Sequence, residues 1–230
     1  MLEALKREVA EANRNIERHA LAALTWGNVS GIDRTRGLVV IKPSGVAYSK
    51  LTPEDMVVVD LENRKVDGAL RPSVDTITHV MLYKAFPAIG GIVHTHSTAA
   101  VAFAQALREI PCFGTTHADH FLGSIPLTRN LTPEEIAEDY EGNTGKVIIE
   151  RFQDLNPTDM PAVLVAHHAP FVWGKNAGDA IKNAVALEHV ADMAQRSLAL
   201  NPALGTIPAH ILNEHYQRKH GPNATYGQGR

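Results

Sequence analysis

The sequence has few features that would suit it to an oxidising or membrane environment. Of its 230 residues only one, Cys112, is a cysteine, so no disulfide can form within the chain. No apolar stretch approaches the roughly 20 residues that a membrane-spanning helix needs. The opening stretch MLEALKREVAEANRNIERHA is charged from Glu3 onward and lacks the apolar segment of a secretory signal. We therefore expect a cytoplasmic protein with no membrane partner.

A surplus of positive charge is also absent. The chain has 22 Lys and Arg against 25 Asp and Glu, a net charge of −3, and no run of like charge. We therefore expect no nucleic-acid partner. Apolar residues make up 44% of the chain and charged residues 20%, which is typical of a globular protein with a substantial core. We expect one domain over residues 1–230.

Periodicity predicts helices that flank a sheet of short strands. Apolar residues spaced three and four apart predict an opening helix through Ile16 and further helices over 73–86, 98–107 and 176–200. A short acidic helix is expected over 133–140, IPCFGTTH is expected to be extended with turns, and KVIIERF fits a strand or a helix. Strands are predicted in LVVIKPSG, DMVVVDL, GGIVH and AVLVAHHAPFVWG. The hairpin-like strand pairs favour a three-layer α/β/α domain with a central, mainly antiparallel sheet.

The stretch GGIVHTHS places two histidines at the end of an apolar run. Side chains alternate between the faces of a strand, so His94 and His96 share a face and can reach one metal ion. Another apolar run ends in VAHHAP, where His167 and His168 point to opposite faces. Periodicity leaves open which of these two joins a site. The alternative is that all four are ordinary polar residues of the core or surface.

A carboxylate stands just before the first histidine strand. Three imidazoles and one carboxylate make a closed zinc shell, whereas three protein ligands with a water or substrate make a catalytic one. Asp75 and His79 lie four residues apart on a predicted helix and share a face. Asp75 is the candidate fourth ligand, and His79 is expected to support the site or pack beside it. His189, His210 and His220 are interpreted as ordinary core or surface residues.

Taken together, these motifs resemble the epimerase branch of the class II aldolase family. The stretches that carry the resemblance follow the family order over almost the whole chain: LTWGNVSG, IKPSGV, RPSVDTITH, GGIVHTHS, GTTHADHFLGSIP, PAVLVAHHAPFVWGKN and HYQRKHGPNATYGQ. The resemblance implies a homotetramer with active sites at subunit interfaces and Zn2+ as cofactor, with Mn2+ or Co2+ as alternatives. It also implies a set of metal ligands: Asp75, His94, His96 and His168. Fuculose-type aldolases have a glutamate in place of Asp75, which favours the epimerase branch.

The activity that the resemblance implies is 4-epimerisation of a sugar phosphate, between L-ribulose 5-phosphate and D-xylulose 5-phosphate. C4 of a 2-ketose is not adjacent to the carbonyl, so its proton cannot simply be removed. The C3 to C4 bond must instead break in a retro-aldol step and re-form after the aldehyde rotates, while a Lewis acid stabilises the enediolate. The C4 hydroxyl loses and regains a proton, which requires two groups. The resemblance assigns these roles to Asp119 and Tyr226.

Turns are expected to hold the phosphate, because backbone amides and hydroxyls at turns bind anions well. By resemblance the phosphate site consists of Gly27, Asn28, Lys42, Ser44, Gly45, Ser73 and Val74. Further candidates for supporting roles are Thr115, Glu141, His215 and Arg218.

Val74 departs from the family pattern, which usually has serine there. Valine keeps the backbone N–H but removes a hydroxyl donor, and a hydrogen bond to a charged group contributes about 1.5 to 3 kcal/mol. A related class II aldolase, or a 4-epimerase acting on another ketose or ketose phosphate, is therefore an alternative. A non-catalytic interaction module, as in the adducin head, is a second alternative, although it would not need the intact metal ligands. A structural zinc site in an unrelated carrier is a third.

Overall fold

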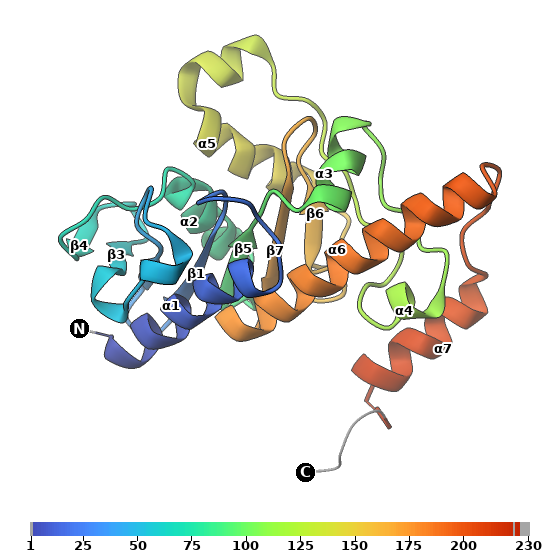
Figure 1. Cartoon of the computed structure of the whole chain (residues 1–230), viewed down its shortest axis with the longest axis horizontal. Coiled ribbons are helices and arrows are strands. Elements are labelled where there is room, and N and C mark those ends of the chain that lie inside the picture. Colours follow the sequence, from blue (N-terminus) through green and yellow to red (C-terminus); the bar gives the residue numbers. More distant parts are fainter. Residues whose placement is uncertain (1, 223, 226–230) are drawn as a thin grey trace.

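A computed structural model describes residues 2–222, 224 and 225 of the chain, in which seven strands form one sheet (Figure 1). The strand order is β4-β3-β2-β1-β5-β7-β6, and the neighbouring strands pair antiparallel. The strands are β1 (Asn28–Asp33), β2 (Leu38–Ile41), β3 (Val57–Asp60), β4 (Lys65–Asp67), β5 (Gly91–His94), β6 (Ala162–Leu164) and β7 (Pro170–Gly174). The helices are α1 (Glu3–Arg18), α2 (Thr76–Ala85), α3 (Thr98–Gln105), α4 (Thr115–Ala118), α5 (Pro133–Arg151), α6 (Ala177–Leu200) and α7 (Ala209–His220).

Helices cover both faces of the sheet, as two neighbouring residues of β1 show. Successive residues of a strand point to opposite faces. Gly31 faces α1, where an added Cβ would lie 2.9 Å from a Leu5 side-chain atom. Ser30 faces the other way, and its hydroxyl lies 2.8 Å from the Tyr83 hydroxyl of α2. Helix α6 packs beside α1 and against β5 and β7, whereas α5 packs on α2. The predicted three-layer α/β/α arrangement with an antiparallel sheet is confirmed.

Strand register brings three chain segments to one edge of the sheet. Asn28 at the start of β1 pairs with His94 at the end of β5, and His94 pairs in turn with Phe171 of β7. All three residues are buried. The edge where β5 ends is therefore the place where polar residues from distant segments can meet.

Several elements differ from the sequence expectations. Of the two alternatives for KVIIERF the helix is observed, since residues 146–151 belong to α5, but α5 is longer than the predicted short helix 133–140 and continues to Arg151. Strand β1 was not predicted, because its polar and glycine residues weaken the apolar alternation. The predicted extended segment IPCFGTTH ends inside α4. Helix α7 was also missed, since Tyr216 is its one buried residue and leaves little apolar periodicity. Within the described residues, none of the helices has the length and apolar character needed to cross a bilayer.

Candidate metal centre and active site

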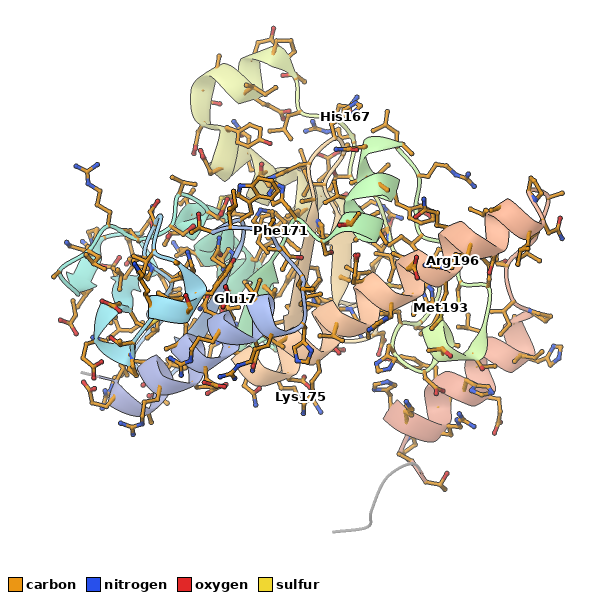
Figure 2. All side chains as sticks on the ribbon, viewed as in Figure 1. Glu17, His167, Phe171, Lys175, Met193 and Arg196 are labelled. Carbon is orange, nitrogen blue, oxygen red and sulfur yellow. The ribbon has the colours of Figure 1, made fainter. Side chains whose placement is uncertain are left out.

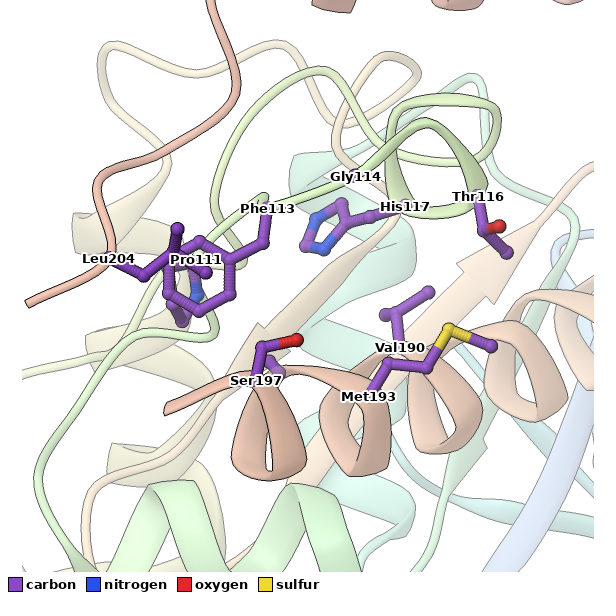
Figure 3. A pocket seen from close by; sticks show the side chains of 10 residues that line it. Pro111, Phe113, Gly114, Thr116, His117, Val190, Met193, Ser197 and Leu204 are labelled. Atoms are coloured by element: carbon purple, nitrogen blue, oxygen red, sulfur yellow. The ribbon is translucent and has the colours of Figure 1, made fainter. Parts of the chain in front are cut away.

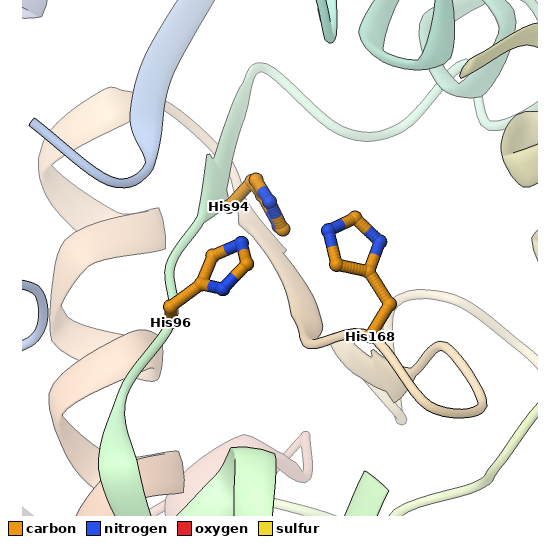
Figure 4. Close-up of side chains that lie close together, drawn as sticks. All are labelled: His94, His96 and His168. Carbon is orange, nitrogen blue, oxygen red and sulfur yellow. The ribbon is translucent and has the colours of Figure 1, made fainter. Parts of the chain in front are cut away.

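Three histidines converge where β5 ends (Figure 4). The nitrogen atoms that His94, His96 and His168 can offer to a metal all lie within 4.8 Å of one another. The three ring centroids are separated by 4.9 to 5.1 Å. His94 is the last residue of β5, and His96 follows beyond the strand. The two rings still reach one point, although the strand ends between them.

The turn between β6 and β7 determines which of its two histidines faces this point. His167 has a left-handed backbone with φ of 58°, an exposed side chain, and an N–H that donates to the Ala104 carbonyl at 3.1 Å. His168 follows it, and its half-buried ring turns toward His94 and His96. Figure 2 shows His167 at the outer end of this turn and Phe171 within the layers. The choice that periodicity left open is made by this backbone conformation.

The three rings suit a divalent metal ion. The His94 Nδ1–H donates to the Pro170 carbonyl at 3.0 Å, which leaves Nε2 for a ligand. The His168 Nδ1 is buried and has no hydrogen-bond partner in the part of the chain that the structure describes. Burial, with a contribution from neighbouring rings, lowers the pKa of His168 to about 3 and also lowers the pKa of His96. These shifts favour the neutral imidazole, which is the form that binds metals.

Asp75 lies beside the histidines but outside their 4.8 Å group. It stands immediately before α2, and its Oδ2 accepts hydrogen bonds from the Asn28 amide at 2.6 Å and the Ser73 hydroxyl at 3.3 Å. Burial raises the pKa of Asp75, but His94, His79 and the Asn28 hydrogen bond outweigh it, so the pKa falls below its ordinary value. The carboxylate is therefore held ionised at the margin of the site, as a metal ligand must be.

Aromatic rings that the sequence analysis did not single out surround the histidines. Phe171 stacks on His94 with centroids 4.3 Å apart and an interplanar angle of 17°. Trp26 lies 6.3 Å from His96, and Tyr140 lies 5.9 Å from His168. Trp26 and Phe171 stand inside the motifs LTWGN and APFVWG, but a motif does not say which ring touches which ligand.

A buried polar chain supports the site from behind. The Ser30 hydroxyl lies 2.7 Å from Nδ1 of His79 and 2.8 Å from the Tyr83 hydroxyl. The His79 ring is fully buried and meets Phe171 edge-on with centroids 5.9 Å apart. Since Phe171 stacks on His94, the His79 ring packs behind the side chain that contacts the first histidine. The expectation for His79 was that it supports the site or packs beside it, and its ring is observed packed against Phe171.

The turns predicted to bind phosphate are joined to one another. The Ser44 N–H donates to the Arg71 carbonyl and the Ser73 N–H to the Lys42 carbonyl, both at 3.0 Å. The Asn28 amide also lies 3.0 Å from the Ser73 hydroxyl, which links the third turn. Gly45, with φ of 71°, faces open space.

Of the residues in the phosphate turns, Gly27 is closely surrounded by other atoms whereas Val74 is exposed. Gly27 has φ of 97°, and an added Cβ would lie 2.5 Å from the His94 carbonyl oxygen, so only glycine fits there. The Val74 side chain is 66% exposed. A different side chain at position 74 would therefore meet solvent or a ligand rather than the core.

Lys42 is buried among these turns. Its ammonium lies 5.1 Å from the centroid of the Tyr48 ring and 3.3 Å from the Pro43 carbonyl oxygen. Burial lowers the pKa of Lys42 to about 8. A phosphate beside this amine would favour its charged form, because opposite charges raise the pKa of an amine.

Asp119 lies apart from the histidines within one chain. It follows α4 directly as its C-cap residue, and its carboxylate accepts from the His215 ring at 3.0 Å and from Arg218 and Lys219 at 3.3 Å, all on α7. Burial raises the pKa of Asp119, but the hydrogen bonds from these three donors lower it by more. The pKa of Asp119 therefore lies below its ordinary value. In Figure 1, α4 and α7 lie at one end of the molecule, beyond β6.

The remaining candidates are divided between these two regions. Thr115 begins α4, on the Asp119 side. Glu141 belongs to α5, and its carbonyl accepts from the Thr78 hydroxyl at 2.6 Å. Tyr226 lies outside the described residues.

A separate cavity lies between α6 and the segment before α4 (Figure 3). Its volume is about 300 Å³, and its ten lining residues include Phe113, His117 and Met193. None of the predicted site residues lines it. The His117 Nε2 lies within 2.8 Å of the Gly123 carbonyl, and the cavity is separate from the histidine group.

Two relatives named L-ribulose-5-phosphate 4-epimerase UlaF, from Salmonella paratyphi C (strain RKS4594) and Salmonella choleraesuis (strain SC-B67), are similar to the chain. Each is 55% identical over 227 residues, which cover 99% of this chain and 100% of the relative.

Solved structures show the same fold. An L-fuculose 1-phosphate aldolase matches with a TM-score of 0.80 at 22% identity, over 94% of this chain and 95% of the other. YgbL from Klebsiella pneumoniae matches with a TM-score of 0.75 at 24% identity, over 93% and 99%. Residues 7–195 match the family described as Class II Aldolase and Adducin N-terminal domain. The chain therefore belongs to the class II aldolase and adducin family, as its motifs predicted.

Proposed function

We propose that this protein is a metal-dependent 4-epimerase that interconverts L-ribulose 5-phosphate and D-xylulose 5-phosphate. The observation that carries the proposal is the convergence of three histidine rings beside an ionised carboxylate. The full-length similarity to relatives named for this reaction supports the choice of substrate. We expect the chain to act as one domain in the cytoplasm.

Zn2+ is the proposed cofactor, and His94, His96 and His168 would hold it with Asp75 as a fourth ligand. When bound there, the ion would supply Lewis-acid stabilisation of the negative charge that develops on the ketose oxygens. Asn28 and Ser73 fix the Asp75 carboxylate through hydrogen bonds.

The joined turns would bind the phosphate and keep the cleaved fragment from escaping. Lys42 would contribute a positive charge to this site. Its pKa is about 8 before binding, so the arrival of the phosphate dianion would complete the protonation of its amine. The Ser44 hydroxyl and the open space at Gly45 leave room for the phosphate oxygens.

Asp119 and Tyr226 are proposed to move the proton at the C4 hydroxyl. Because Asp119 contacts α7 rather than the histidines, we propose that it serves the site of a neighbouring subunit in a homotetramer. His215 and Arg218 would then bring positive charge to the same site. Thr115 and Glu141 are proposed to support it.

Asparagine substitutions at two adjacent histidines test the proposal. His168→Asn should lose zinc and at least about a hundredfold in turnover of L-ribulose 5-phosphate, because a metal ligand is removed. His167→Asn should keep both, since its side chain is exposed and asparagine tolerates the left-handed backbone. Zinc content and turnover are measured on both purified proteins. Full activity of the metal-free His168→Asn protein would contradict the proposal.

A further inference from the structure

The Tyr140 phenol stands beside the histidine group with its hydroxyl uncommitted. We propose that Tyr140 is a substrate-contacting residue, whose hydroxyl donates a hydrogen bond to an oxygen of the bound sugar. A break in α5 presents the ring to the site. This inference rests on the proposed function in one respect, namely that the ligand is a ketose or ketose phosphate.

The position of the ring is the first line of support. Its centroid lies 5.9 Å from that of His168 at an interplanar angle of 49°, and the side chain is 36% exposed. Tyr140 therefore lies beside one of the three histidines that can hold the metal.

The second line of support is a comparison with the other tyrosines of the described residues. The Tyr48 hydroxyl donates to the Trp26 and Gly27 carbonyls. Those of Tyr83 and Tyr216 are hydrogen-bonded to Ser30 and Asp159. The Tyr140 hydroxyl, by contrast, has no hydrogen-bond partner within the described part of the chain. An available donor beside a metal-binding group is suited to a ligand oxygen.

The third line of support is the break that places the ring. Inside α5, Asp139 leaves the helical conformation with φ of −165° and ψ of 92°. Its Oδ1 accepts from the Gly142 N–H at 3.0 Å, as the N-cap of a new helix does. Tyr140 is then the first residue of the second segment. An added Cβ on Gly142 would lie 2.0 Å from an Asp139 oxygen, so a larger residue at position 142 would displace the capping carboxylate.

Contacts on both sides of the break hold this geometry. The Asn143 side-chain amide donates to the Glu135 carbonyl at 2.7 Å, across the break. The Thr144 hydroxyl donates to the Tyr140 carbonyl at 2.8 Å. The Thr78 hydroxyl of α2 donates to the Glu141 carbonyl at 2.6 Å. The backbone at Tyr140 is thus tied to both helix segments and to α2, whose start carries Asp75.

Tyr140→Phe separates substrate contact from simple packing, because it keeps the ring and removes only the hydroxyl. We measure the Kd and KM for L-ribulose 5-phosphate, L-ribulose and D-xylulose 5-phosphate on cobalt-loaded full-length protein, together with cobalt affinity and Tm. The variant should bind its best ketose roughly three- to tenfold more weakly, the range expected for one lost hydrogen bond. Cobalt affinity and Tm should stay unchanged.

Asp139→Ala should weaken binding in the same direction by releasing the cap, whereas Asp139→Ser, which keeps a capping oxygen, should bind as the wild type does. Glu138→Gln, at an exposed position of the same helix, is the matched control and should change nothing.

Wild-type ketose affinity in Tyr140→Phe would overturn the role of its hydroxyl. A wild-type protein that binds a ketose but does not epimerise L-ribulose 5-phosphate would overturn the proposed function, and the Kd comparison would still decide the role of Tyr140. A wild-type protein that binds none of the three sugars would overturn both.

Discussion

The side-chain amide of Asn28 lies 2.6 Å from a carboxylate oxygen of Asp75 and joins the start of β1 to the start of α2. Asn28→Ala should lower zinc affinity by about ten- to a hundredfold, because groups that orient a metal ligand carry that much of the affinity. Competition with a chromophoric chelator measures the change. Asn183→Ala, which removes an amide bonded to the Trp173 carbonyl of β7, is the control and should keep wild-type affinity. Unchanged zinc affinity in Asn28→Ala would show that the hydrogen bond does not position Asp75.

The buried Lys42 gives a prediction about stability and pH. Its folded-state pKa of about 8 lies below the ordinary 10.5, so between these values the unfolded chain holds a proton that the folded chain has lost. Stability should therefore rise with pH across this window, and below it the folded state carries the cost of a buried charge. Lys42→Met should raise the free energy of unfolding at pH 7 by roughly 1 to 3 kcal/mol.

Urea unfolding of the metal-free proteins at pH 7 and near pH 10 measures this difference. The advantage of Lys42→Met should shrink at the higher pH, and its affinity for the sugar phosphate should fall. A variant that is less stable than the wild type at both pH values would contradict the buried-charge argument.

Val74 replaces the serine that the family usually has in the phosphate turns, and a single substitution restores that serine. Val74→Ser should lower the KM for L-ribulose 5-phosphate several-fold, because it restores a hydroxyl donor toward a charged group. Since the side chain is 66% exposed, the free energy of unfolding should change by less than about 0.5 kcal/mol. The KM for unphosphorylated L-ribulose is the internal control and should not change. Equal effects on both sugars would show that position 74 does not contact the phosphate.

Asp119 is expected to have both a catalytic and a structural effect. Asp119→Asn should lower turnover by about a hundredfold or more, as for loss of an acid/base group. It should also speed proteolysis between α6 and α7, because the carboxylate accepts from three residues of α7. Asp192→Asn, which removes an exposed ion pair with Arg196, should leave both unchanged. Full turnover in Asp119→Asn would exclude it from proton transfer.

The sequence predicted best those features that are local in the chain. The spacing of His94 and His96 places both rings at one strand end, and continuous apolar runs mark buried strands such as β3 and β7. The choice between His167 and His168 depends on a left-handed backbone, which neither composition nor period encodes. The family resemblance had already named His168.

Long-range contacts explain what the sequence could not show. The short helix predicted over 133–140 contains Asp139, so the break that presents Tyr140 is visible only from its cap and the contact to α2. Helix α7 is polar, and its packing on α4 through Asp119 depends on residues about a hundred positions apart. The joined phosphate turns likewise require segments that meet only after the sheet has formed.

The central claim is that the protein epimerises L-ribulose 5-phosphate by breaking and re-forming a carbon bond at this histidine site. The most direct test is carbon NMR of the zinc-loaded protein with L-ribulose 5-phosphate, with a chelated sample in parallel. We predict D-xylulose 5-phosphate without free glycolaldehyde phosphate, and no product in the chelated sample. Accumulation of the free aldehyde, or turnover that persists without metal, would contradict this account.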